Sequence, residues 1–410
     1  MSCVTEIKSC RACGSPRLTA LFSLGEQYVS NFVKQEEIHS GVKCPIQLVL
    51  CDECTLVQLA HTAPQDFMYT RHYWYRSGVT DSMRAALIDI TSEIESFQIL
   101  NEGDIVLDIG SNDGTLLRSY EASVVTVGIE PAVNLADEGK VGVTHFVNKF
   151  WSKEAYDELD LPKAKVITAI GMFYDLEDPN QFIGDIADSL DDDGLFVAQL
   201  MCLTNMLRLR DVGNLAHEHL EFYSLESLRV LLGKHGLEIF ALSQNAVNGQ
   251  SYRLYIRKIG SSLCVTPRGG DKLQEELAAE STLTLDFYKE FFDGIESQKK
   301  ATVDFVSRAV RNGSRVWVYG ASTKGNVILQ YYGLDHALIE GAADRSPEKH
   351  GLYTIGTGIQ IHSESWARKV NPNYFLVLPY AFLNEFLERE RTWRYSGGRF
   401  IVPVPSFRII

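Results

Sequence analysis

Three adjacent side chains in the middle of the chain, His217, Glu218 and His219, carry groups that can exchange protons near neutral pH. A neutral imidazole accepts a proton in this range, and a neighbouring carboxylate can orient it or adjust its pKa. The spacing does not fit the H-E-x-x-H pattern, which puts two histidine ligands on one helix face. We therefore expect a general base here rather than a metal site. The alternative is that one imidazole binds a buried carbonyl group while the other faces solvent.

Two pairs of cysteines near the N-terminus have the spacing of metal-binding knuckles. Cys10 and Cys13 form one C-x-x-C pair, and Cys51 and Cys54 form the other. Each pair can present two thiolates to a tetrahedral Zn²⁺ ion, and four thiolates leave no open position for catalysis. The sequence therefore predicts a structural zinc site. Cys44 is a possible rival ligand, and a redox-active C-x-x-C pair is the other alternative.

A third group of residues surrounds a glycine turn. The apolar run at residues 105–109 is typical of a strand buried on both faces of a parallel sheet, and the glycines after it permit a tight turn. The loop lacks the third glycine of a G-x-G-x-x-G sequence, and its carboxylates suit ammonium and sulfonium groups better than a pyrophosphate. An acid ends the next strand, where nucleotide-binding βαβ units place a carboxylate for ribose hydroxyls. The expected cofactor-binding residues are Asp108, Gly110, Asn112, Asp113, Gly114 and Glu130.

Two further stretches could contact a ligand. An aromatic and basic cluster at residues 67–78 contains Tyr73 and Tyr75, which could cover the mouth of the cofactor pocket or form only a hydrophobic hinge. A turn at residues 320–325 joins an expected strand to a helix, and such a helix start can bind phosphate through its amides. The alternative is a structural turn with a solvated lysine. The candidate residues are Ser322, Thr323, Lys324 and, at the end of the following strand, Asp344.

These residues need elements that bring them to one edge of a sheet. Strands are expected at residues 105–109, 124–129, 166–170, 195–200, 237–242 and 254–257, and helices at residues 81–97, 181–190 and 225–236. A further helix is expected to open near Thr115. This alternation predicts a doubly wound α/β sheet. The segment at residues 172–178, which contains Asp175, then lies at the carboxyl edge, where open α/β folds bind ligands.

The C-terminal third shows a second arrangement of the same kind. Helical periodicity covers residues 271–292 and 295–310, with an interruption expected at Asp293-Gly294. Strands are expected at residues 315–319, 338–343, 375–379 and 400–404, with a helix through Tyr332 after the first. We therefore predict three domains, at residues 1–72, 73–262 and 263–410.

Composition narrows the class of protein. The chain has 410 residues and is 45 % hydrophobic, which supports two or three domains with sizeable cores. A formal charge of −14 argues against a nucleic-acid partner or an anionic membrane surface. No apolar run suits a membrane span, and the first residues lack the features of a signal peptide. Eight cysteines in a chain of this length predict reduced thiols and a cytoplasmic location.

The glycine loop resembles motif I of class I S-adenosylmethionine (SAM) methyltransferases. The chain resembles SAM-dependent nucleotide-sugar C-methyltransferases over nearly its whole length. The resemblance rests on the order of these stretches: the two cysteine pairs, Leu107-Asp-Ile-Gly-Ser-Asn-Asp-Gly114, His217-Glu-His219 with Tyr223-Ser224, Gly320-Ala-Ser-Thr-Lys-Gly325 and Asp344-Arg-Ser-Pro-Glu-Lys349. These methyltransferases are typified by 3-C-methyltransferases of deoxysugar pathways. The resemblance implies an N-terminal zinc-binding domain, a central Rossmann-like SAM domain and a C-terminal Rossmann-like domain that helps to bind a nucleotide-linked 4-keto sugar.

The resemblance also implies roles for individual residues. His219 is the expected base, with Glu218 beside it, His217 as its substitute and a tyrosine of the Tyr73/Tyr75 pair near the reacting groups. The expected substrate-binding residues are Asp175, Tyr223, Ser322, Thr323, Lys324 and Asp344. The chain departs from the family pattern at residues 171–175 and at Ala216, positions expected to line the sugar site. Two alternatives stay open: an O- or N-methyltransferase acting on another small metabolite, and a non-catalytic zinc scaffold with a vestigial SAM fold.

Overall fold

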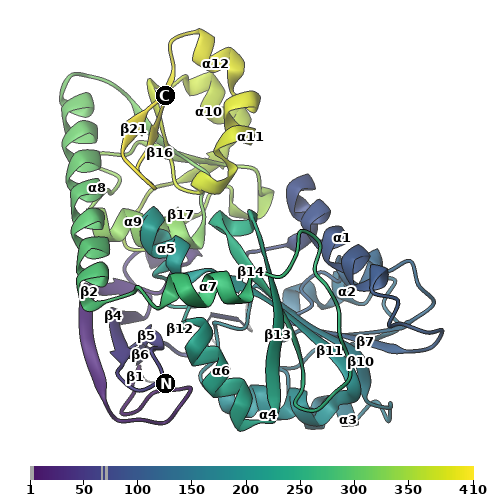
Figure 1. The fold of residues 1–410 in the computed structure, drawn as a ribbon. Coiled ribbons are helices and arrows are strands. Elements are labelled where there is room, and N and C mark those ends of the chain that lie inside the picture. Colours follow the sequence, from purple (N-terminus) through teal and green to yellow (C-terminus); the bar gives the residue numbers. More distant parts are fainter. Residues whose placement is uncertain (1–3, 66–67, 70–72) are drawn as a thin grey trace.

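The computed structural model describes residues 4–65, 68, 69 and 73–410. Three sheets of four or more strands form the cores of an N-terminal, a central and a C-terminal region (Figure 1). None of the helices in the described part of the chain is long and apolar enough to cross a membrane.

The central sheet has seven strands in the order β13-β14-β11-β10-β7-β8-β9. Its strands are β7 (Ile105–Ile109), β8 (Val125–Ile129), β9 (His145–Val147), β10 (Ala164–Ile170), β11 (Leu190–Met201), β13 (Leu237–Asn245) and β14 (Ser251–Lys258). The strands from β11 to β9 are parallel, and β14 and β13 add an antiparallel edge. Every residue of β7 is buried, as its apolar run predicts. The chain leaves β7 toward β8 and β9 and later returns to β10 on the other side, and this switch point is where such sheets bind ligands.

The helices beside this sheet agree with the expected ones in three places. They are α1 (Asp81–Ser96), α4 (Pro179–Ser189) and α6 (Leu225–Lys234). The prediction of a helix that begins near Thr115 is wrong, because only a 3₁₀ turn, η4 (Leu117–Ser119), forms there. The chain must re-enter the sheet at Val125, so the connection has room for little more than one turn.

The prediction of a helix break at Asp293-Gly294 is also wrong. Helix α8 (Leu285–Arg311) runs through both residues, and the break lies earlier, after α7 (Leu273–Glu280). A Cβ atom at Gly294 would collide with the side chain of Arg210. This glycine therefore serves close packing of α8 against the central region and not a chain turn.

The N-terminal region is built on a four-stranded antiparallel sheet. Its strands are β2 (Leu18–Tyr28), β4 (Lys43–Cys51), β5 (Val57–Leu59) and β12 (Glu221–Phe222). The last of these follows the His217-Glu-His219 sequence directly, and it pairs Glu221 with Gln58 and Phe222 with Val57. The sheet of the N-terminal region thus includes a strand that lies within the central range predicted from the sequence.

The C-terminal sheet has the order β18-β16-β15-β19-β20-β21, and only β21 is antiparallel. Its strands are β15 (Val316–Tyr319), β16 (Gly341–Asp344), β18 (Ile361–Ser363), β19 (Tyr374–Val377), β20 (Arg399–Val402) and β21 (Arg408–Ile409). Its helices are α9 (Thr323–Tyr332), α10 (Glu364–Val370), α11 (Leu383–Arg389) and α12 (Arg391–Tyr395). Helix α8 runs beside both this region and β2 (Figure 1), and Phe292 of α8 stacks on Phe22 of β2 at 4.7 Å.

Candidate active site

A cavity of about 690 Å³ lies at the carboxyl edge of β7, β8 and β10. This volume is within the roughly 300–1,000 Å³ typical of small-molecule sites. Six of the residues predicted from the sequence line it: Tyr73, Tyr75, Gly110, Asn112, Glu130 and Asp175. Gly110 has φ +70°, which a side chain would strain, and its missing Cβ also leaves room for Met172.

Glu130 ends β8 and is held by the backbone of the glycine loop. Its Oε2 accepts a hydrogen bond from the amide of Asn112 at 2.9 Å, and its Oε1 accepts one from the amide of Ala132 at 2.8 Å. Each oxygen keeps a lone pair for another donor, and the side chain lines the cavity. Burial raises the pKa of Glu130, and the two amide hydrogen bonds oppose this rise. The carboxylate is therefore fixed in a position where it can bind the two hydroxyls of a ribose.

The other two predicted acids of the loop lie outside the cavity lining. Asp108 is buried between strands and accepts a hydrogen bond from the Thr168 hydroxyl at 2.6 Å, and burial raises its pKa to about 7. Asp113 accepts a hydrogen bond from the amide of Gly78 at 2.7 Å. Gly114, with φ +76°, closes the turn. These residues shape the loop that carries the cavity wall.

Residues 73–78 cover this loop. The Asn112 side chain accepts a hydrogen bond from the Ser77 amide at 2.9 Å and donates one to the Tyr75 carbonyl at 3.2 Å. Asn134 pairs in the same way with the amide and the carbonyl of Tyr73. Both tyrosines therefore stand in the cavity wall because two asparagines hold their backbone. Positions 67 and 70–72 of the aromatic cluster lie outside the described residues.

His219 is oriented by a backbone carbonyl. Its Nδ1 lies 2.8 Å from the carbonyl oxygen of Asn214, and since a carbonyl can only accept, Nδ1 carries the hydrogen. The lone pair is then on Nε2. The ring packs edge-on against Tyr174 at 4.8 Å. Burial first, and then the charge of Lys324, lowers the pKa of His219 to about 3, so the imidazole is neutral.

His217 is bound in a different way. Its Nε2 lies 2.9 Å from the carbonyl oxygen of Cys44, so Nε2 donates the hydrogen bond. Its Nδ1 is buried without a hydrogen-bond partner among the described residues. Cys44 therefore anchors this histidine through its backbone, and its sulfur lies outside the four-cysteine group. Both histidines of the motif are buried, so the alternative in which one of them faces solvent is wrong.

Acidic groups gather beside His219. Burial raises the pKa of Glu218 to about 7, and the charge of Lys324 opposes this rise. Burial, followed by the charges of Glu218 and Glu221, raises the pKa of Asp175 well above its usual range. The Oδ1 atom of Asp175 has no hydrogen-bond partner among the described residues although it is buried. Asp175 lines the cavity, whereas Glu218 and His219 are not among the residues that line it.

The remaining predicted residues are not brought to the cavity. Tyr223 is buried against Phe173, with ring centroids 5.2 Å apart. The Ser322 hydroxyl caps α9 by accepting a hydrogen bond from the Gly325 amide, and the Thr323 carbonyl accepts one from Ser30. Asp344 accepts hydrogen bonds from the amides of residues 321 and 346.

Lys324 points into the central region. Its Nζ donates a hydrogen bond to Oδ1 of Asn214 at 2.6 Å, and Asp211, Asp175 and Glu218 are the acidic groups that act on its charge. It is not on an open phosphate-binding surface.

Several residues of the site were not predicted from the sequence. Asn214 ends a 3₁₀ turn before the histidines and Asp211 directly precedes that turn, and Asn134 lies in a 3₁₀ turn after Glu130. Tyr69 lines the cavity and donates a hydrogen bond to the carbonyl of Glu218 at 3.0 Å. Tyr69 belonged to the aromatic cluster, and Asp211 and Asn214 belonged to the stretch around the histidines, but none of the three was predicted as a site residue.

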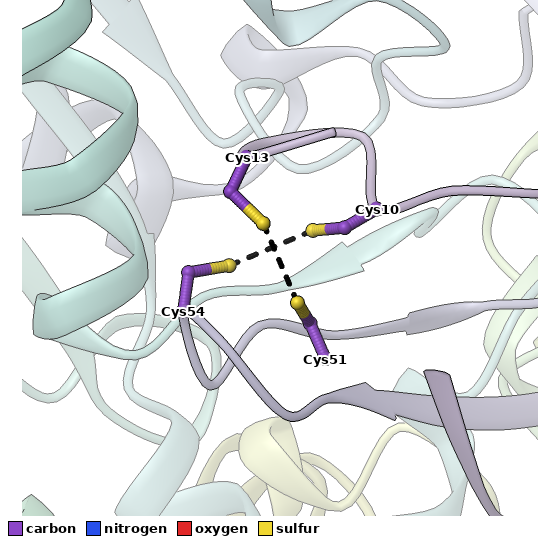
Figure 2. A group of neighbouring side chains, drawn as sticks. All are labelled: Cys10, Cys13, Cys51 and Cys54. Atoms are coloured by element: carbon purple, nitrogen blue, oxygen red, sulfur yellow. Dashed lines mark hydrogen bonds between the residues drawn. The ribbon is translucent and has the colours of Figure 1, made fainter. Parts of the chain in front are cut away.

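The four predicted cysteine ligands converge in space. Their sulfur atoms all lie within 4.8 Å of one another, and Figure 2 shows the four side chains pointing to a common centre. The Cys10–Cys54 and Cys13–Cys51 sulfur distances are 3.5 and 3.4 Å. A tetrahedral zinc with Zn–S bonds of about 2.3 Å requires sulfur separations of about 3.8 Å. The group therefore fits one Zn²⁺ ion.

The first cysteine knuckle is docked on the central region. The carbonyl of Ala12 accepts hydrogen bonds from Asn180 at 3.1 Å and from Lys234 at 2.7 Å. The Arg11 guanidinium lies 3.7 Å from the buried carboxylate of Glu221, whose backbone amide donates a hydrogen bond to the carbonyl of Tyr174. The zinc-binding region thus supports the segments on both sides of the acidic cluster.

Comparisons with known proteins agree with this arrangement. A family described as a zinc binding domain matches residues 10–69, a methyltransferase domain matches residues 81–242, and a C-methyltransferase C-terminal domain matches residues 246–405. The C-methyltransferase NovU of Streptomyces niveus is 29 % identical over an alignment of 416 positions that covers 99 % of this chain and 98 % of that protein.

Two similar solved structures each match less than half of the chain. Magnesium protoporphyrin IX methyltransferase from Synechocystis PCC 6803 shares 13 % identity and a TM-score of 0.34 over 45 % of this chain and 91 % of its own. The cyclopropane synthase MmaA2 of Mycobacterium tuberculosis shares 14 % identity and a TM-score of 0.34 over 47 % of this chain and 90 % of its own.

The strand order, the glycine turn, the placement of Glu130 and the matching methyltransferase family define a class I SAM-dependent methyltransferase domain. Together with the zinc-binding domain, the matching C-terminal domain and the relative that is similar over its whole length, they support a SAM-dependent C-methyltransferase. The expected fold class, the SAM and zinc cofactors and the enzyme class are confirmed. These matches describe C-methyltransferases, and they describe neither a non-catalytic scaffold nor an O- or N-methyltransferase.

Proposed function

We propose that this C-methyltransferase transfers the methyl group of SAM to a ring carbon, C3, of a nucleotide-linked 4-keto sugar. The observation that carries the proposal is the hydrogen bond between His219 Nδ1 and the carbonyl of Asn214, because it leaves the Nε2 lone pair as a base. Carbon is a poor nucleophile, and a base that removes the proton beside a ketone generates the nucleophile required.

Each step uses groups of this chain. His219 Nε2 takes the proton from the carbon beside the ketone, and the C–H electron pair moves into an enolate. SAM, when bound, supplies an electrophilic methyl group on a positively charged sulfur. The enolate electron pair forms the new C–C bond, and the electrons of the S–C bond remain on sulfur. Burial keeps the pKa of Tyr73 well above the usual range, so its phenol remains protonated and can donate a hydrogen bond to the enolate oxygen.

The acidic cluster gives the reaction a second proton-carrying group. Because the pKa of Glu218 is raised to about 7, its carboxyl group can take up or release a proton near neutral pH. Burial and its acidic neighbours raise the pKa of Asp175 well above its usual range, and in its protonated form this residue of the cavity wall can donate a hydrogen bond to a substrate oxygen. A substrate in the cavity therefore meets the cluster through Asp175, Tyr69 and Tyr73.

The nucleotide end of the substrate is proposed to lie between the central and C-terminal regions. The full-length match to a C-methyltransferase and the second parallel sheet at residues 316–402 support this part. Ser322 and Thr323, at the partly exposed start of α9, remain the proposed contacts of the nucleotide, with Asp344 shaping the turn. Tyr223 is packed in the core against Phe173, so we assign it a role in supporting the His217-Glu-His219 segment and no contact with the substrate.

The test is turnover of SAM with a panel of nucleotide-linked 4-keto sugars, followed by NMR of the product. A new methyl group bonded to C3 is the expected result, and the α-proton should exchange with deuterated solvent when SAM is left out. Methylation of an oxygen or nitrogen atom, or of a carbon that is not beside a ketone, would refute the proposal.

A further inference from the structure

Asn214 is the junction of a hydrogen-bond network next to His219. Its carbonyl orients His219, its Oδ1 accepts the hydrogen bond of Lys324 at 2.6 Å, and its Nδ2 donates one to Asp211 at 2.8 Å. Asn214 ends η6 (Val212–Asn214) and is 3 % exposed. Every polar group of its side chain is thus engaged, and the carbonyl that holds the imidazole cannot turn without breaking these bonds.

Two members of the network come from the C-terminal region. Lys324 lies in the first turn of α9, and Tyr380 begins η9 (Tyr380–Phe382) just after β19. The Tyr380 hydroxyl donates a hydrogen bond to Asp211 at 2.9 Å. Helix α9 also packs directly on η6, where a Cβ atom at Gly213 would lie 3.5 Å from Ile328. The loop that holds His219 is therefore clamped by a different region of the chain.

The charges around His219 come from several elements. Glu218 is on the same loop, Asp175 follows β10, Asp211 precedes η6, and the phenols of Tyr69, Tyr73 and Tyr174 border the cluster. Lys324 is the cation whose charge acts on His219, and it disfavours the imidazolium form. The same ammonium is placed beside three carboxyl groups, those of Asp211, Asp175 and Glu218.

We propose that Asn214, Asp211, Lys324 and Tyr380 form a positioning network through which the C-terminal region holds His219 as a neutral base with its Nε2 lone pair free. Lys324 and Tyr380 are positioning residues in this proposal, and it replaces the phosphate contact expected for Lys324 from the sequence. The role of the network in turnover rests on the proposed function of His219 as base. The orientation of the His219 ring does not depend on that proposed function, and it can be measured separately.

The experiment compares Lys324→Met, Lys324→Arg and Tyr380→Phe in the full-length protein. Tyr319→Phe is the matched control, because its hydroxyl also donates a buried hydrogen bond in the C-terminal region, to Glu390 at 2.6 Å. One readout is the ¹⁵N spectrum of the His219 ring, assigned with His219→Asn. The other is the split between kcat and the KM values for SAM and the keto sugar.

Wild type should show Nδ1 protonated and Nε2 unprotonated. Lys324→Met should raise the pKa of His219 by about one unit, since a nearby positive charge is lost. It should lower kcat about 10–100-fold, as expected when a catalytic group is misplaced, with KM for SAM unchanged. Lys324→Arg should recover part of kcat. Tyr380→Phe should lower kcat about 3–10-fold for one lost hydrogen bond, and Tyr319→Phe should leave the ring signals and kcat unchanged.

Unchanged ring signals and kcat in both folded variants, Lys324→Met and Tyr380→Phe, would overturn the network. A rise in KM for the keto sugar, with kcat and the ring signals unchanged, would show that Lys324 binds substrate and does not position His219. If His219→Asn keeps full turnover while Lys324→Met still shifts the His219 signals, the proposed base fails and the network stands. If His219→Asn abolishes turnover and Lys324→Met shifts nothing, the network fails and the base stands.

Discussion

Replacement of Glu130 by alanine tests the cofactor site most directly. The carboxylate lines the cavity with one lone pair free on each oxygen, so two ribose hydroxyls can each donate a hydrogen bond to it. Hydrogen bonds to a charged, desolvated group contribute about 1.5–3 kcal/mol each. Loss of one such bond corresponds to about a tenfold weaker affinity and loss of both to at least a hundredfold. We expect SAM to bind Glu130→Ala at least tenfold more weakly.

The same substitution also removes two acceptors that hold the loop. The amides of Asn112 and Ala132 lose their partner, and we expect unfolding to become easier by about 2–3 kcal/mol, because the desolvation cost of the buried carboxylate disappears at the same time. Glu95→Ala is the matched control. Glu95 accepts hydrogen bonds from the amides of Glu121 and Ala122, each at 2.8 Å, and it does not line the cavity.

The assay is calorimetric titration of SAM into each folded variant, together with thermal unfolding in the absence of SAM. Both variants should lose stability, and only Glu130→Ala should lose affinity. A Kd within about twofold of wild type for Glu130→Ala would remove Glu130 from the site. An equal loss of affinity in Glu95→Ala would show that weakened folding, and not a ribose contact, caused the effect.

Three further predictions follow from the other groups. Purified protein prepared without chelators should contain about one zinc per chain, and Cys51→Ser should lower both the zinc content by elemental analysis and the unfolding temperature; zinc-free wild type would contradict this. His219→Asn should keep SAM affinity while turnover falls about 10²–10⁴-fold, and wild-type exchange of the substrate α-proton in this variant would move the base elsewhere. The pKa of Glu218 rises from 4.5 to about 7 on folding, so its protonated form stabilises the native state below that window and this contribution is lost as pH rises through it. Glu218→Gln should therefore lose less stability than wild type between about pH 5 and pH 7.5, and parallel unfolding curves would contradict the shift.

Elements with a strong local signal could be predicted from the sequence. The run at residues 105–109 is apolar at most positions and β-branched, and it forms the buried strand β7 because no other element accommodates that pattern so well. Expectations failed where packing overrides local preference. Gly294 weakens a helix in isolation, yet α8 passes through it because contact with Arg210 requires a residue without a side chain.

The residues of the site likewise fall into those that the sequence indicated and those that only the tertiary structure revealed. Residue type and spacing alone indicated the cysteine pairs, the glycine turn, Glu130 and the His217-Glu-His219 motif, because each is a short sequence whose chemistry depends on neighbours a few positions away. Asp108 shows the limit of this reasoning. It belongs to the motif, but its side chain is taken up by Thr168 on the adjacent strand, a partner that depends on strand order.

Which histidine nitrogen is basic, and what Lys324 does, were decided only by the tertiary structure. The tautomer of His219 depends on a carbonyl at Asn214, and the direction of Lys324 depends on α9 packing against η6 from 110 residues away. No local pattern encodes these contacts, since a lysine at a helix start can face solvent, a phosphate or a carboxylate with equal ease. The choice is made by the close packing of two regions, which places an amide oxygen within hydrogen-bonding distance of the ammonium and leaves it among carboxyl groups.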